Sequence, residues 1–154
     1  MAALKKGDKA PDFTGTDQQG NQVSLSGFRG KKLILYFYPK DDTPGCTAEA
    51  CNLRDNFQEL TGKGFVVLGV SPDKEASHRK FISKYILPFT LISDPGKQIL
   101  KAYDAWGMKS MYGKQYEGVL RKTYVVDEQG DIMAIIEKVD TKDHTRQIME
   151  ELNK

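Results

Sequence analysis

The chain has 154 residues, with 23 lysines and arginines against 21 aspartates and glutamates, so its formal net charge is +2. A domain of this size can bury roughly 70% of its unfolded surface, and we expect one domain over residues 1–154. The balanced charge and the lack of long basic runs argue against binding of nucleic acid or anionic membranes. The longest unbroken apolar run, Leu33–Tyr38, is far too short to span a membrane.

The amino-terminal segment lacks the apolar stretch of a secretory signal, which favours a cytoplasmic protein in a reducing compartment. In such a compartment, two closely spaced cysteines are more often catalytic, redox-sensing or metal-binding than a permanent disulfide. The chain has two cysteines, Cys46 and Cys51, five positions apart. Their role is therefore the central question that the sequence raises.

The first half of the chain predicts a hairpin followed by a βαβ unit. Alternating residues from Phe13 to Leu25 around Gly20-Asn21 are typical of a hairpin. Continuous apolar runs at 33–38 and 65–70 predict strands that are covered on both faces. Between them, apolar residues at helical spacing from Thr47 to Leu60 predict a helix.

The middle of the chain predicts two helices and then a loop. Ser71-Pro72 and Asp94-Pro95 each combine a capping residue with a proline that suits the first helical turn, so we expect a helix to start at each. Residues 105–120 show no clear period and are interpreted as a long loop, which in a compact domain tends to be functional. Four of its residues would either wall an active site or pack the base of the loop: Trp106, Met111, Tyr112 and Tyr116.

The last segment predicts a second hairpin and a closing helix. The hairpin turns at Glu128–Asp131, and the amphipathic helix covers 142–152. The order of elements predicts a three-layer α/β domain with a mixed central sheet flanked by helices. This order resembles the thioredoxin fold, extended by an amino-terminal β-hairpin.

The position of Cys46 favours a reactive thiol. A predicted strand ends at Pro39, a short acidic turn follows, and a helix begins near Pro44. Cys46 therefore falls in the first helical turn, where unpaired backbone N–H groups favour a thiolate. Cys51 lies more than a turn further into the helix, where no comparable field acts, so the two thiols should differ in reactivity.

The spacing of the two cysteines is incompatible with a disulfide inside an intact helix. Five residues along an ideal helix separate two Cα atoms by roughly 8.7 Å, whereas a disulfide needs about 4.4–6.8 Å. Either the pair never forms a bridge, or bridging unwinds at least the first helical turn, as in a transient catalytic disulfide. A static disulfide would close a very short loop and stabilise the fold only slightly.

Three other interpretations of the pair are less favoured. Zinc needs about four ligands, but the two histidines, His78 and His144, lie far away in the sequence and are interpreted as surface or capping residues. A thioredoxin-like reductase would carry C-x-x-C at a helix start, whereas the spacing here is C-x-x-x-x-C. Inert core thiols would fit poorly beside Thr43, Pro44 and Gly45.

The segment PKDDTPGC, residues 39–46, has the form P-x-x-x-T-x-x-C. Together with Cys51 and the segment GVLRKTYVVD, it resembles the peroxiredoxins, and more narrowly their bacterioferritin comigratory protein (PrxQ) group. The similarity extends over nearly the whole chain, through the segments GDKAPDF, GVSPD and MYGKQYEG. This combination is much more specific than the first motif alone.

The resemblance implies a thiol-dependent peroxidase that reduces hydrogen peroxide and organic hydroperoxides in antioxidant defence and cell redox homeostasis. Cys46 would be the peroxidatic cysteine, oxidised to sulfenic acid, and Cys51 the resolving cysteine in an intramolecular disulfide of the atypical 2-Cys type. Thioredoxin or a similar dithiol would restore the thiols, without metal, haem or flavin. Since Cys51 is the last cysteine, we expect resolution within one chain or with an external thiol, and we favour a monomer over a dimer.

The resemblance also implies roles for the residues that precede the helix. Thr43 would place its hydroxyl beside the thiolate and hydrogen-bond both the sulfur and the peroxide. Pro39 would shield the pocket from water. Pro44 has no N–H, so the amides of Gly45 and Cys46 would be the available donors.

Arg121 would supply a fixed positive charge for the Cys46 thiolate and for the leaving oxygen. Glu49 would orient this arginine, although a solvated carboxylate in the first helical turn is an alternative. The rival to a peroxidase is a thioredoxin-fold redox sensor or interaction module with little turnover. Thr43 and Arg121 favour the enzyme, because a relay needs no donors for a leaving oxygen.

Overall fold

The computed structural model describes residues 3–154, and none of the helices in this range is long and apolar enough to cross a membrane. In chain order, the elements are β1 (Thr14–Asp17), β2 (Gln22–Ser24), the 3-10 helix η1 (Leu25–Phe28), β3 (Lys32–Phe37), α1 (Pro44–Asp55), α2 (Phe57–Gly62), β4 (Phe65–Ser71), α3 (Glu75–Tyr85), β5 (Thr90–Ser93), α4 (Gln98–Ala102), β6 (Trp106–Met111), β7 (Lys114–Val119), β8 (Lys122–Val126), β9 (Ile132–Ile136) and α5 (His144–Leu152).

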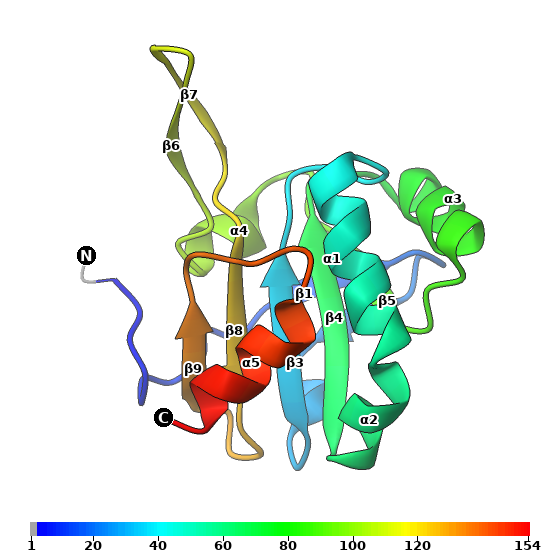
Figure 1. Cartoon of the computed structure of the whole chain (residues 1–154), viewed down its shortest axis with the longest axis vertical. Helices are drawn as coiled ribbons and strands as arrows, with labels where there is room; N and C mark the ends of the chain where they lie inside the picture. The colour runs from blue at the N-terminus through cyan, green and yellow to red at the C-terminus, as the bar shows by residue number, and fades with distance from the viewer. Residues whose placement is uncertain (1–2) are drawn as a thin grey trace.

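The centre of the fold is a mixed sheet. Within residues 3–154, seven strands pair in the order β2-β1-β5-β4-β3-β8-β9. Strands β3, β4 and β5 are parallel, while β8, β9 and the β1–β2 hairpin join them in antiparallel fashion. Helices α1 and α5 lie side by side across one face of the sheet (Figure 1). The predicted three-layer α/β domain is confirmed.

Strand β3 lies in the middle of the sheet and is buried on both faces. Leu33, Leu35 and Phe37 face one apolar cluster, which α4 and the amino-terminal segment cover. The alternate residues Ile34 and Tyr36 face a second cluster, which α1, α3 and α5 cover. This alternation is the consequence of a strand with continuous apolar residues between two helical layers.

The predicted helix starts at Ser71 and Asp94 are wrong. Ser71 remains in β4, where it pairs with Ser93, and its hydroxyl donates to the Asp73 carboxylate at 2.8 Å. Helix α3 therefore begins later, at Glu75. Asp94 does satisfy a helix amide, since its carboxylate accepts the N–H of Leu100 at 2.8 Å, but α4 begins only at Gln98. The predicted helix over 47–60 is divided into α1 and α2 at Asn56.

Residues 105–120 form a β-hairpin rather than the predicted loop. Strands β6 and β7 pair with each other and with no other strand of the described chain. The hairpin projects from the body of the molecule (Figure 1). Its turn is Tyr112-Gly113, whose φ angles of 53° and 77° suit a two-residue hairpin turn. The prediction failed because Gly107 and Gly118, which face each other, interrupt the alternating pattern.

Candidate active site

Cys46 is the third residue of α1 and is 1% exposed. The first α-helical bond of this turn joins the Thr47 amide to the Thr43 carbonyl at 2.8 Å. The amides of Gly45 and Cys46 precede that bond, so they have no carbonyl partner of the helical type. The sulfur therefore lies at a helix start, as the sequence predicts, in a position that favours an anion.

Sheet pairing brings Arg121 to the same place. Strand β8 runs antiparallel to β3 with Phe37 opposite Lys122, so Arg121 lies beside the end of β3 that leads toward α1. Its Nη2 is 3.4 Å from Cys46 Sγ and its Nη1 donates to Glu49 Oε1 at 2.8 Å. A side chain at Gly45 would meet Arg121 Nη2 at 3.3 Å, so glycine there leaves room for the guanidinium.

Glu49 is buried, and the alternative of a solvated carboxylate is wrong. It lies one turn after Cys46 on α1 and is 0% exposed. Burial raises the pKa of Glu49 to about 7, although the adjacent Arg121 opposes this shift. The carboxyl group can therefore gain or lose a proton near neutral pH while it is in contact with the arginine.

His144 is a site residue that the sequence interpretation missed. It is 0% exposed, so its assignment as a surface or capping residue is wrong. Its Nε2 lies 2.7 Å from Thr123 Oγ1 and 3.4 Å from Glu49 Oε2. Burial, together with the charge of Arg121, lowers the pKa of His144 to about 4. The available signal was its spacing of four from Ile148, which places both on one helix face.

The hydroxyl of Thr43 bonds differently from expectation. Its Oγ1 donates to the Lys40 carbonyl at 2.8 Å, so its single proton is directed away from the Cys46 sulfur. Pro39 is half-buried in the turn before the helix. Thr43 therefore offers lone pairs, rather than a proton, to a molecule that enters beside Cys46.

Cys51 lies within the continuous helix α1, is partly buried, and both cysteines are free thiols. The next residue, Asn52, joins α1 to the start of α5. Its Oδ1 accepts the Thr145 amide at 2.8 Å, and its Nδ2 donates to the Lys142 carbonyl at 3.2 Å. The segment that carries Cys51 is thus held in helical form by contacts with α5.

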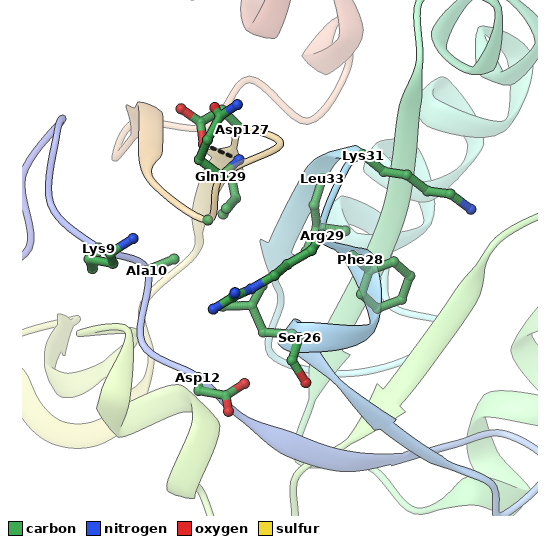
Figure 2. Close-up of a pocket in the computed structure, with 13 residues that line it drawn as sticks. Lys9, Ala10, Asp12, Ser26, Phe28, Arg29, Lys31, Leu33, Asp127 and Gln129 are labelled. Atoms are coloured by element: carbon green, nitrogen blue, oxygen red, sulfur yellow. Dashed lines mark hydrogen bonds between the residues drawn. The ribbon is translucent and has the colours of Figure 1, made fainter.

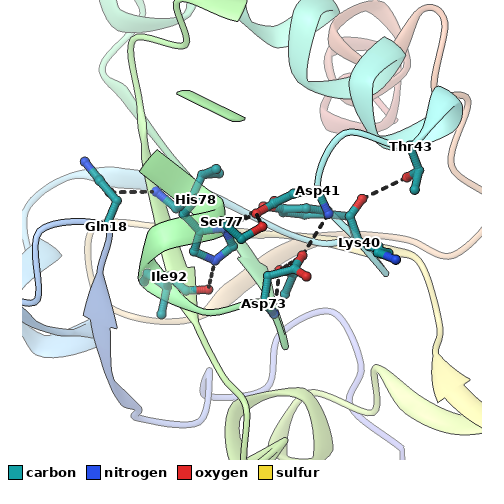
Figure 3. A network of polar contacts seen from close by, with 11 residues as sticks. Gln18, Lys40, Asp41, Thr43, Asp73, Ser77, His78 and Ile92 are labelled. Atoms are coloured by element: carbon teal, nitrogen blue, oxygen red, sulfur yellow. Dashed lines mark hydrogen bonds and ion pairs between the residues drawn. The ribbon is translucent and has the colours of Figure 1, made fainter. Parts of the chain in front are cut away.

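A second polar network anchors the turn before the helix (Figure 3). Asp41 accepts hydrogen bonds from Tyr38 at 2.6 Å and from Ser77 at 2.7 Å, and lies 2.7 Å from His78 Nδ1. The Asp41 amide donates to Asp73 at 2.7 Å. His78 is buried, so its interpretation as a surface residue is also wrong. Asp41, Asp73 and His78 could be metal ligands by type, but their facing atoms are already engaged in these bonds.

A pocket lies at the other end of β3 from the cysteine, near Leu33 (Figure 2). Its volume is about 110 Å³, and Arg29 extends across it toward Lys9 and Ala10. As far as the described chain shows, its lining includes none of the residues expected around Cys46. The candidate active site is therefore the surface at the start of α1 rather than this pocket.

Comparisons with known proteins agree with this geometry. Residues 6–135 match the AhpC/TSA family. The chain is 44% identical over 144 residues to peroxiredoxin Bcp of Escherichia coli strain K12. The aligned region covers 94% of this chain and 92% of that protein. The solved structure of a cysteine-to-serine mutant of Xylella fastidiosa PrxQ has a TM-score of 0.91 and 27% identity, over 99% of this chain and 98% of that one.

A solved structure of the bacterioferritin comigratory protein of Xanthomonas campestris is also similar. It has a TM-score of 0.85 and 33% identity, over 92% of this chain and 90% of that one, and alkyl peroxide reduction activity is ascribed to that protein. The fold is thioredoxin-like, as predicted. The chain thus belongs to the AhpC/TSA family, and within it to the peroxiredoxins of the Bcp and PrxQ group.

Proposed function

We propose that this peroxiredoxin carries out its thiol-dependent peroxidase reaction through Cys46, on hydrogen peroxide and organic hydroperoxides. The observation that carries the proposal is the distance of 3.4 Å between Arg121 Nη2 and Cys46 Sγ at the start of α1. The guanidinium and the helix start both favour a thiolate, which is the nucleophilic form of cysteine. The alkyl peroxide activity ascribed to the Xanthomonas campestris relative supports organic hydroperoxides as substrates.

In the first step, the Cys46 thiolate attacks one oxygen of the peroxide and the O–O bond breaks. The attacked oxygen stays on sulfur as sulfenic acid, and the other leaves as water or alcohol after it takes up a proton. Arg121 stabilises the negative charge that develops on the leaving oxygen. Because Thr43 directs its proton to Lys40, its oxygen accepts the O–H of the peroxide and orients it.

In the second step, the Cys51 thiol attacks the sulfenic acid, a disulfide forms and water leaves. Both cysteines lie in the same continuous helix, where their Cα atoms are too far apart for this bond. The first turns of α1 must unwind, which breaks the contacts that Asn52 makes with α5. Thioredoxin or a similar dithiol then reduces the disulfide of this atypical 2-Cys monomer, and Cys46 returns to the helix start.

Intact-mass measurement after one equivalent of peroxide tests the assignment. The expected product is a monomer that has lost two hydrogen atoms as the Cys46–Cys51 disulfide. Cys46→Ser should abolish the reaction with peroxide, whereas Cys51→Ser should react once and stop as sulfenic acid. A covalent dimer, or equal loss of the first turnover in both variants, would contradict the roles proposed for the two cysteines.

A redox sensor with little turnover is the rival function. Arg121 and Thr43 lie where a leaving oxygen and a peroxide need donors and acceptors, which favours an enzyme. Steady-state consumption of micromolar peroxide with excess dithiol separates the two functions. If the wild-type protein forms the disulfide once but does not continue to consume peroxide, it acts as a redox sensor rather than as a peroxidase.

A further inference from the structure

Glu49 has one carboxyl oxygen that is buried without a partner. Oε1 accepts from Arg121 at 2.8 Å, but Oε2 makes no hydrogen bond within residues 3–154. The nearest basic nitrogen, His144 Nε2, lies 3.4 Å away. A buried carboxylate oxygen without a hydrogen bond is energetically costly. This arrangement therefore disfavours the ionised form of Glu49.

The hydrogen bonds of Gln147 determine where His144 carries its proton. Gln147 Nε2 donates to the Lys138 carbonyl at 2.6 Å, and Oε1 accepts the Asp140 amide at 2.8 Å, which fixes the orientation of the amide. His144 Nδ1 lies 3.0 Å from the same Oε1 and must donate to it. In the neutral ring, Nε2 therefore has a lone pair, which accepts the hydroxyl of Thr123.

His144 Nε2, which carries no proton in the neutral ring and lies 3.4 Å from Glu49 Oε2, acts oppositely on the two forms of the carboxyl group. It repels a carboxylate oxygen, but it can accept a hydrogen bond from a protonated one, in competition with the Thr123 hydroxyl. We propose that His144 is a positioning residue that favours protonated Glu49 and thereby leaves the charge of Arg121 to the Cys46 thiolate.

Two groups that can be anionic, the Glu49 carboxyl group and the Cys46 thiol, share the single positive charge of Arg121. Arg121 contacts Glu49 through Nη1 and Cys46 through Nη2, so a proton on Glu49 removes the competitor of the thiolate. The ionisable groups around Glu49 are Arg121 from the β7–β8 connection, His144 from α5, Cys46 from α1 and Tyr36 from β3. Burial raises the pKa of Glu49 to about 7, so this exchange occurs near neutral pH.

The kinetic test compares variants in the first reaction of Cys46 with hydrogen peroxide. This kinetic test rests on the proposed function. The rate constant is measured by rapid quench and mass spectrometry over a range of pH. The range extends from below to above the pKa of Glu49, which is about 7. The wild type should show an inflection from Glu49, and Glu49→Gln, which mimics the protonated form, should lack it. His144→Phe should move the inflection about one pH unit lower and reduce the rate near neutral pH severalfold.

Two controls separate positioning from a merely structural effect. Arg146→Gln, on the exposed side of α5, should leave the pH profile unchanged. In the Glu49→Gln background, His144→Phe should cause no further change in the shape of the profile. If His144→Phe lowers the rate equally at every pH, or acts equally in both backgrounds, the proposal is wrong.

A spectroscopic measurement needs neither activity nor a folded His144 variant. Infrared difference spectra of the wild type against Glu49→Gln should show the band of a protonated carboxyl group below the pKa of about 7. Absence of this band at a pH between the ordinary glutamate range and that value overturns the proposal. A protein that shows the band but does not react with peroxide would instead contradict the proposed function.

Discussion

The two buried histidines, His78 in α3 and His144 in α5, occupy contrasting environments. In His78, Nδ1 lies 2.7 Å from Asp41 Oδ2 and Nε2 lies 3.2 Å from the Ile92 carbonyl. Each ring nitrogen of His78 therefore lies within hydrogen-bond distance of an oxygen acceptor. Every facing atom of this network has a partner, which suits a rigid anchor.

His144 instead donates through one nitrogen and accepts through the other, and the adjacent Glu49 Oε2 has no hydrogen bond among the described residues. A complete buried network mainly fixes structure, whereas an incomplete one retains a group that can change its protonation state. The incomplete network is the one that contacts the Cys46 sulfur through Arg121. The complete network around His78 therefore supports the active site structurally, whereas the incomplete network around His144 takes part in its chemistry.

The largest expected effect is on stability, when the complete network loses a member. Asp41→Ala removes the acceptor of a buried imidazole and should cost roughly 3–5 kcal/mol, measured by urea unfolding. The matched control is Asp42→Asn, because Asp42 makes an exposed pair with Lys84 at 2.8 Å. A similar loss in both variants would mean that burial of the first pair is unimportant.

The next largest effect is expected when the positive charge of Arg121 beside Cys46 is removed. Arg121→Ala should slow the reaction of Cys46 with peroxide about 10²-fold, as expected when one preorganised donor is removed. Arg121→Lys should recover only part of the rate, because lysine cannot contact Cys46 and Glu49 with two nitrogens at once. A rate constant within twofold of the wild type in both variants would contradict the role of the arginine.

The pH dependence of stability should differ between the wild type and Glu49→Gln. The folded pKa of Glu49, about 7, is above the unfolded value, so its stabilising contribution is present at low pH and is lost as pH rises through about 7. The loss is roughly 3 kcal/mol, because burial raises this pKa from 4.5 to about 7. His144, with its pKa lowered to about 4, destabilises both proteins as pH falls, which is opposite in direction to the effect of Glu49. A melting-temperature difference that is constant with pH would contradict the shift.

The smallest effects should come from one hydroxyl in each network. Ser77 donates to Asp41 and Thr123 donates to His144, both at 2.7 Å. Ser77→Ala should cost about 1.5–3 kcal/mol, because its acceptor is a carboxylate, and Thr123→Val about 1 kcal/mol, because its acceptor is neutral. Equal losses in chemical denaturation would remove the electrostatic distinction between the two networks.

The elements that were predicted correctly are those with a strong local pattern. The apolar runs of β3 and β4, the turn of the amino-terminal hairpin and the helix start at Pro44 were all visible in the sequence. The hairpin over 105–120 was not, because paired glycines remove the alternation. The helix starts at Ser71 and Asp94 were misplaced because these side chains bond to nearby amides from outside the helices.

The sequence by itself determined where a reactive thiol could lie and that its partner cysteine is too distant for a disulfide in an intact helix. Both conclusions depend on local backbone geometry, which five residues of spacing specify. Only the tertiary structure decided that Arg121, Glu49 and His144 meet beside Cys46, because the pairing of β3 with β8 and the packing of α5 on α1 join distant segments. Burial, which moves the pKa of Glu49 to about 7, exists only once those segments have packed.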